Sequence, residues 1–74
     1  MPAPLPFREV TGEVAAFDEA RGLGTVRVDG GDEVPFHCTA IADGSRAIDE
    51  GARVRFSVVP GRLGRWEATH IAPA

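Results

Sequence analysis

The stretch RGLGTVRVDGGDEVPFHC, residues 21–38, decides the fold predicted for this chain. It holds two short runs, residues 24–28 and 34–38, in which apolar and polar residues alternate with a period of two. The residues between them are Asp-Gly-Gly-Asp, and an Asp-Gly turn between alternating runs is the strongest short-range signal of a β-hairpin. We therefore expect a central hairpin, with the functional site on it or beside it.

Three further strands are expected around this hairpin. The same alternation occurs in residues 7–17, 51–60 and 65–71. The first of these strands is expected to bend or bulge at Gly12. For the last strand, the sequence does not decide which of the two alternating sets of side chains faces inward. Residues 39–50 carry turn chemistry and room for a single helical turn. Five short strands separated by turns predict an all-β fold, a five-stranded antiparallel barrel whose closure removes exposed edges.

The length of 74 residues predicts one domain. Residues 1–7 include three prolines and are expected to form a flexible N-terminal lead, with residues 8–72 as the domain. Cys38 is the single cysteine, so an intrachain disulfide is excluded. No apolar run approaches the roughly 20 residues of a membrane helix, and no export signal precedes the domain, so we expect a cytoplasmic protein without a membrane partner.

The charge balance argues against non-specific binding to nucleic acid. The net charge is −3, and all eight basic residues are arginines. Arginine suits contacts with phosphates and bases. A GC-rich genome would also favour arginine over lysine, and we prefer this second explanation for the absence of lysine. Because non-specific binding is largely phosphate electrostatics, a nucleic-acid role has to depend on a local patch.

Catalytic and metal chemistry find little support in the sequence. His37, Cys38 and His70 match no metal-ligand spacing, and a structural zinc site needs four ligands. Cys38 has no identifiable base or helix terminus to activate it as a nucleophile. The Gly22-x-Gly24 pair continues into a strand, whereas a phosphate loop opens a helix, so these glycines are expected to serve a tight turn or close backbone approach. We expect no enzyme, no cofactor and no small-molecule substrate.

The motifs along the chain resemble the bacterial cold-shock domain. Residues 12–18 (GEVAAFD) and 21–26 (RGLGTV) look like that family's opening, G-x-V-K-W-F-N followed by K-G-F-G-F-I. Residues 34–41 (VPFHCTAI) resemble its second motif, V-F-V-H-F-S-A-I, and Glu50-Gly51 with Val54 and Phe56 resembles E-G-x-x-V-x-F. The resemblance implies an OB-fold barrel that binds single-stranded nucleic acid on the face carrying the two motifs.

The stacking rings of the family are mostly replaced here. In the family, outward aromatic side chains stack bases, and each stack contributes about 1–3 kcal/mol. Carried over by position, only His37 keeps a ring, and Arg21 keeps a basic residue where the motif has Lys. Phe36 falls on an inward position and is expected in the core. The remaining stacking positions fall on residues without an aromatic ring, namely Ala16, Leu23, Thr25, Pro35 and Cys38.

Arginines and a tryptophan offer compensating contacts. Arg53 and Arg55 share a strand face, and Arg62 and Arg65 flank the following turn, so the four could follow a phosphate backbone. The alternative is a solvated face on which they pair with acids, for which Asp49, Glu50 and Glu67 are candidates. For Trp66, the single Trp, a core or cap position is the first expectation, with base stacking or a partner contact as alternatives.

Two functions follow from this interpretation. The first is cold-shock-type binding of single-stranded RNA or DNA, weak and low in sequence specificity because the rings are lost. The second is an OB-fold protein-interaction or self-association module, as a homodimer or with a protein partner, using the smoother apolar face. The residues expected to contact nucleic acid are Phe17, Arg21, Leu23, Thr25, His37, Arg53, Arg55 and Trp66.

Overall fold

The computed structural model describes residues 9–45, 47–61 and 64–74. Within them the chain forms five strands and one short 3-10 helix. In chain order these are β1 (Glu9–Asp18), β2 (Leu23–Val28), β3 (Glu33–His37), η1 (Cys38–Ala40), β4 (Arg53–Pro60) and β5 (Trp66–Pro73). The five predicted strands are confirmed. The expected lead at residues 1–7 lies outside the described residues.

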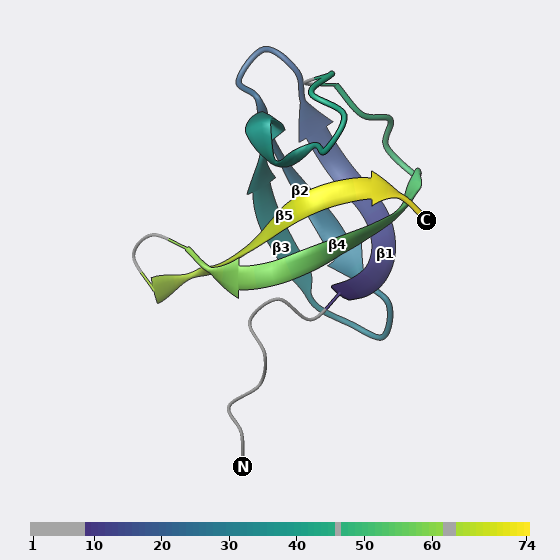
Figure 1. Ribbon diagram of the computed structural model, residues 1–74, viewed down its shortest axis with the longest axis vertical. Coiled ribbons are helices and arrows are strands. Elements are labelled where there is room, and N and C mark those ends of the chain that lie inside the picture. The colour runs from purple at the N-terminus through teal and green to yellow at the C-terminus, as the bar shows by residue number, and fades with distance from the viewer. Residues whose placement is uncertain (1–8, 46, 62–63) are drawn as a thin grey trace.

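All four strand pairs are antiparallel and join into one sheet in the order β3-β2-β1-β4-β5. Figure 1 shows the sheet strongly curled, so that β5 runs across β3, with which it is in contact. A parallel bridge between Ile41 and Ile71 joins the residue after η1 to β5. The described part of the chain contains no helix long and apolar enough to span a membrane.

The core lies inside the curled sheet and is built from the apolar side chains at alternate positions of the strands. Phe56 is fully buried on β4, and Phe36 on β3 is 2% exposed, as expected for an inward position. Alternation explains this arrangement, because successive side chains of a strand point to opposite faces. The other buried members of the core are Val14, Val26, Val34, Ile41, Val54, Ala68 and Ile71.

The β2–β3 hairpin has the turn that its sequence predicts. Val28 N–H donates to the Asp32 carbonyl at 2.8 Å, and Gly31 N–H donates to the Val28 carbonyl at 2.9 Å. Gly30 has φ 94°, a left-handed conformation that glycine adopts without steric cost. The hairpin therefore fixes the register that places residues of β2 and β3 opposite one another.

The irregularity of β1 lies further along the strand than predicted. The register with β2 shifts between Val14 and Ala16, not at Gly12. Gly12 pairs regularly with both Val28 and Val54, and its lack of a side chain serves close approach, because a Cβ there would overlap the Arg27 carbonyl oxygen. As a result of the bulge, Val14 is buried whereas Ala16 is exposed.

A second irregularity explains why no inward parity could be assigned to the last strand. Ser57 pairs with Thr69 and Arg55 pairs with Ala72, so β5 carries an extra residue at this point. His70 has φ 55°, uncommon for a residue other than glycine. The extra residue lets Ala68 and Ile71 both face the core, although they are three positions apart.

Asp29 ties the hairpin turn to two other strands. Its carboxylate accepts a bidentate pair of hydrogen bonds from Arg53 on β4, at 2.8 and 2.7 Å, and a third from the Thr11 hydroxyl on β1 at 2.8 Å. These bonds favour the charged carboxylate, and they lower the pKa of Asp29 from 3.8 to about 2, with the Arg53 hydrogen bonds as the largest cause.

This lowered pKa predicts an acid-dependent loss of stability. Because the folded pKa lies below the unfolded value of 3.8, the contribution is present above about pH 4 and is lost as the pH falls toward 2. We expect the melting temperature of the Asp29→Asn variant to fall less between these pH values than that of the wild type. Asp32→Asn, in the same turn, is the control. Parallel curves for wild type and Asp29→Asn would contradict the prediction.

Candidate nucleic-acid interface

The two resembling motifs place their outward residues in adjacent rows across β1, β2 and β3. Ala16, Thr25 and Pro35 are paired neighbours in one row. Asp18, Leu23 and His37 form the next, two residues along each strand. Residues two apart on a strand face the same side, so both rows lie on one surface. We call these six residues the contact face.

The structure thus brings three of the predicted site residues together on this face. Leu23 and His37 are exposed, Leu23 at 46%, and Thr25 is half-buried between Ala16 and Pro35. Three of the six residues of the face are apolar, namely Ala16, Leu23 and Pro35, and His37 supplies its aromatic ring. The other five residues of the face have no aromatic ring on which a base could stack.

Phe17 belongs to the opposite parity of β1 and points toward the core. It is half-buried, and its ring stacks parallel to that of Phe36, with centroids 5.8 Å apart and 2° between the planes. Gly24, its partner on β2, makes room for this arrangement, since a Cβ there would stand 2.7 Å from Phe36 Cζ. Phe17 therefore lies beneath the contact face rather than on it.

Arg21 lies in the tight turn between β1 and β2, beside the contact face. Gly22 has φ 69° and its N–H donates to the Asp18 carbonyl at 2.8 Å. The Gly22 carbonyl accepts the Cys38 N–H at 2.8 Å, and a Cβ on Gly22 would stand 2.9 Å from Cys38 Sγ, so the expected tight turn is confirmed. Arg21 is exposed, and its guanidinium forms no ion pair within the described residues.

His37 is held in one tautomer by the start of η1. Its Nδ1 accepts the Thr39 N–H at 3.2 Å and lies 2.9 Å from the Thr39 hydroxyl. Because a backbone N–H can only donate, Nδ1 is an acceptor, and the neutral ring carries its proton on Nε2. His37 can therefore offer both a ring face and an N–H donor to a ligand.

A shallow hollow of about 300 Å³ opens between the ends of β1 and β2. Its lining includes the aromatic residue Phe17 and two acidic residues, Asp18 and Glu50. Glu50 reaches it from the segment before β4, where its Oε2 accepts the Phe17 N–H at 3.3 Å. The lining residues are Ala16, Phe17, Asp18, Leu23, Gly24, Thr25 and Glu50.

The next row on the same outer surface is occupied by ion pairs. Glu13 pairs in register with Arg27, which also lies 3.4 Å from Glu33. Arg53 is bound to Asp29, and Arg55 lies 4.0 Å from Glu9. We call this set the ion-pair belt, and it comprises Glu9, Glu13, Arg27, Asp29, Glu33, Arg53 and Arg55.

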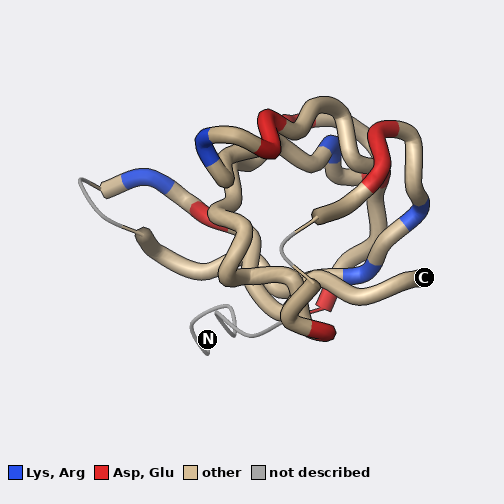
Figure 2. Tube along the Cα trace, turned by 90° about the horizontal axis from the view of Figure 1, so that it is seen from above, with Lys and Arg blue, Asp and Glu red and all other residues tan. Residues whose placement is uncertain are grey.

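The ion-pair belt includes two of the arginines that were expected to contact phosphates. Arg53 and Arg55 are paired with acids, as the solvated-face alternative predicts, although the partners are Asp29 and Glu9 and not the acids expected. Figure 2 shows the described arginines spread around the molecule and interspersed with acids. Arg62 lies outside the described residues. Binding of Arg53 or Arg55 to a phosphate therefore requires an acid partner to be exchanged.

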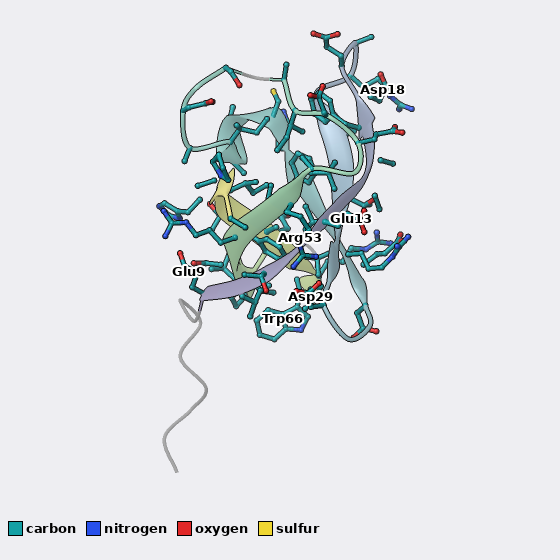
Figure 3. The ribbon with its side chains drawn as sticks, turned by 90° about the vertical axis from the view of Figure 1, so that its right-hand side faces the viewer. Glu9, Glu13, Asp18, Asp29, Arg53 and Trp66 are labelled. Atoms are coloured by element: carbon teal, nitrogen blue, oxygen red, sulfur yellow. The ribbon has the colours of Figure 1, made fainter. Side chains whose placement is uncertain are left out.

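Trp66 is not the core or cap residue first expected. It is 54% exposed at the start of β5, opposite Pro60. Figure 3 shows it at the other end of the molecule from Asp18, which belongs to the contact face. The structure therefore does not bring Trp66 together with Leu23 and His37.

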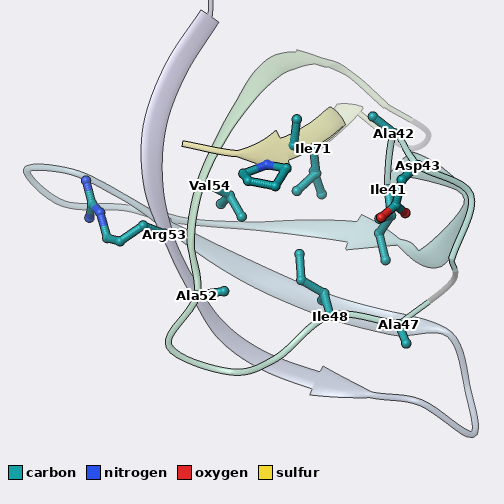
Figure 4. Close-up of a pocket in the computed structure, with 11 residues that line it drawn as sticks. Ile41, Ala42, Asp43, Ala47, Ile48, Ala52, Arg53, Val54 and Ile71 are labelled. Atoms are coloured by element: carbon teal, nitrogen blue, oxygen red, sulfur yellow. The ribbon is translucent and has the colours of Figure 1, made fainter.

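A second hollow, of about 330 Å³, shares no residue with the first (Figure 4). It lies between β5, the start of β4 and the segment after η1, and its wall is largely apolar, with Ile41, Ile48 and Ile71 among its residues. No group of three or more His, Cys, Asp or Glu side chains in the described parts of the chain is placed to hold a metal ion.

Sequence reasoning missed the two carboxylates of the first hollow. Asp18 had a usable signal, because it occupies the place where the resembling motif has Asn. Glu50 had no sequence signal that linked it to this site. It is 33 residues from Phe17, whose N–H it accepts, and the packing of the segment before β4 brings the two residues together.

Comparison with known proteins agrees with the fold and with the placement of the motifs. The family model described as the 'Cold-shock' DNA-binding domain matches residues 10–74. Cold shock protein CspD of Bacillus subtilis is 43% identical over 54 residues, which cover 72% of this chain and 82% of that protein. Cold shock protein CspB of Geobacillus stearothermophilus is 39% identical over 61 residues, covering 81% and 92%.

A solved structure is similar over nearly the whole chain. The structure of drosophila Unr CSD456 matches with a TM-score of 0.74 and 29% sequence identity. The match covers 92% of this chain but 27% of the other chain, which is therefore much longer. Together with the five antiparallel strands, this likeness confirms the predicted OB-fold.

Proposed function

The chain belongs to the cold-shock domain family, and on that basis we propose that it binds single-stranded RNA or DNA on its contact face. The observation that carries the proposal is the register of β1, β2 and β3. It aligns the outward positions of both motifs in two adjacent rows, with His37 at the end of one of them. Such a surface can receive successive bases of an extended strand.

The proposed binding is weak and low in sequence specificity. The missing rings remove stacking contributions of about 1–3 kcal/mol per base. The arginines that could compensate through phosphate contacts are mostly held in the ion-pair belt. Affinity then rests on His37, on the apolar surface of Leu23 and Thr25, on the half-buried Phe17, and on Arg21.

The remaining predicted residues stay in the proposal as peripheral contacts. Arg53 and Arg55 would reach a phosphate only by exchanging Asp29 or Glu9, and Trp66 would contact a strand that extends to the far end of the molecule. The proposal is one of binding without catalysis or a cofactor, in the cytoplasm. The unpaired thiol of Cys38 suits a reducing compartment.

The alternative, a protein-interaction or self-association module, has one observation in its favour. Leu23 is exposed at 46% in a face whose neighbours Ala16 and Pro35 are also exposed and apolar. Light scattering tests its homodimer form. A dimer in solution that cannot bind oligonucleotides would favour this alternative over the proposal.

Titration of labelled single-stranded DNA and RNA oligonucleotides at about 50 and 200 mM salt tests the proposed function. We expect binding that weakens with salt, because each phosphate contact contributes about −0.7 to the slope of log K against log salt. Arg21→Ala should lower the magnitude of this slope by about 0.7, since Arg21 has no acid partner to release.

Arg27→Ala is the matched control, because it removes the same charge from a residue already paired with Glu33 and Glu13. Its slope should stay that of the wild type. Failure of both DNA and RNA to bind at the lower salt concentration would overturn the proposed function.

A further inference from the structure

The hollow between β1 and β2 offers a flat apolar floor. Phe17 is one of its lining residues, and the half-buried Phe17 ring is held by its parallel stack on Phe36. The residues beside Phe17 in the lining are small, because Ala16 contributes only a methyl group and Gly24 no side chain. A planar ring is the kind of group that rests on such a surface with favourable stacking.

Two carboxylates stand at this floor, each positioned by a backbone N–H. Asp18 Oδ1 accepts the Arg21 N–H at 3.2 Å, and Glu50 Oε2 accepts the Phe17 N–H at 3.3 Å. Within the described residues, the second oxygen of each carboxylate has no hydrogen-bond partner. The hollow therefore presents acceptors and no side-chain donor other than the Thr25 hydroxyl.

The bases differ in how well they match such a set of acceptors. On its Watson–Crick edge guanine carries two adjacent donors, N1–H and the N2 amino group, which fit the two oxygens of a carboxylate or two neighbouring carboxylates. Uracil and thymine carry one N–H between two carbonyl oxygens, which a carboxylate repels. Adenine and cytosine carry one amino donor beside a ring-nitrogen acceptor. Single-stranded nucleic acid leaves these edges free to be read.

We propose that this hollow takes one unstacked guanine, whose ring rests on Phe17 and whose N1–H and N2 amino group donate to Asp18 and Glu50. The inference rests on the proposed function and adds a base preference at one position of an otherwise unspecific strand. The neighbouring Arg21, which lacks an ion pair among the described residues, is placed to contact the phosphate of that nucleotide. Phosphate attraction there offsets the repulsion from the two carboxylates.

Uridine-rich oligonucleotides carrying one central guanosine, inosine or uridine test this assignment. We expect the guanosine strand to bind roughly tenfold tighter than the uridine strand, as is usual for a paired hydrogen-bond contact to a base. Inosine keeps N1–H and lacks the amino group, so it should fall between them.

Asp18→Asn and Glu50→Gln replace one acceptor by a donor, and each should reduce the ratio of the affinity for the guanosine strand to that for the uridine strand. Glu19→Gln is the control, because it removes the same charge one residue from Asp18 without lining the hollow. Equal binding of the guanosine and uridine strands by the wild type would overturn the guanine site and leave the proposed function standing. A preference that survives in both variants would also overturn it, whereas failure of all three strands to bind would remove the proposed function itself.

Discussion

Replacing Ala16 by Trp is expected to tighten the binding of single-stranded DNA by roughly 5- to 150-fold. Ala16 is exposed on the contact face, beside Thr25, so a large ring there lies against solvent and is free to stack on a base. One added stack contributes about 1–3 kcal/mol, which converts to that range of affinity. Fluorescence titration of an oligothymidylate follows the change, with the quenching of the new Trp as a second signal.

Ala16→Leu separates stacking from added apolar bulk at the same position. Leucine adds volume without a π-face, so its affinity should remain within about threefold of the wild type. If Ala16→Trp binds no tighter than Ala16→Leu, the contact face does not meet bases.

Replacing Phe56 by Ala is expected to remove a large part of the free energy of unfolding of the domain. Phe56 is fully buried at the centre of the core, and such truncations cost about 3–5 kcal/mol. A domain of 74 residues has a total stability of roughly 4–11 kcal/mol at 0.05–0.15 kcal/mol per residue. Circular dichroism with urea titration measures the loss.

Val58→Ala on the same strand is the matched comparison. Val58 is half-buried and packs at the margin of the core, so its truncation should cost much less than that of Phe56. Similar losses for the two variants would show that burial at Phe56 does not carry the stability assigned to it.

The sequence predicted those parts of the fold that depend on residues close together in the chain, namely the alternating strands and the hairpin turn. Alternation predicted the strands β2, β3 and β4, in which Val26, Phe36 and Phe56 are buried, and the Asp-Gly turn predicted the hairpin, because both depend on neighbouring residues alone. The bulge in β1 and the extra residue at His70 were not predicted. Both irregularities adjust a strand to its neighbours in the curled sheet. Because those neighbours are distant in the sequence, the local pattern does not reveal where a bulge is needed.

The same division applies to the candidate site. The motif resemblance named Leu23, Thr25 and His37 together, and the hairpin register places the three on one face. It could not show that Arg53 is bound to Asp29, which is 24 residues away, or that Glu50 reaches the floor beside Phe17. It also gave no reason to expect Trp66 on the surface at the far end.

The ion-pair belt has a consequence for how quickly a nucleic-acid strand can be captured. Its three arginines and four acids alternate over neighbouring strands, so their fields nearly cancel beyond the Debye length of about 8 Å in physiological salt. A polyanion approaching this flank is neither guided nor turned away before contact. Encounter then depends on diffusion and orientation, with association rate constants of about 10⁵–10⁶ M⁻¹s⁻¹ in place of the faster values that a basic groove would give.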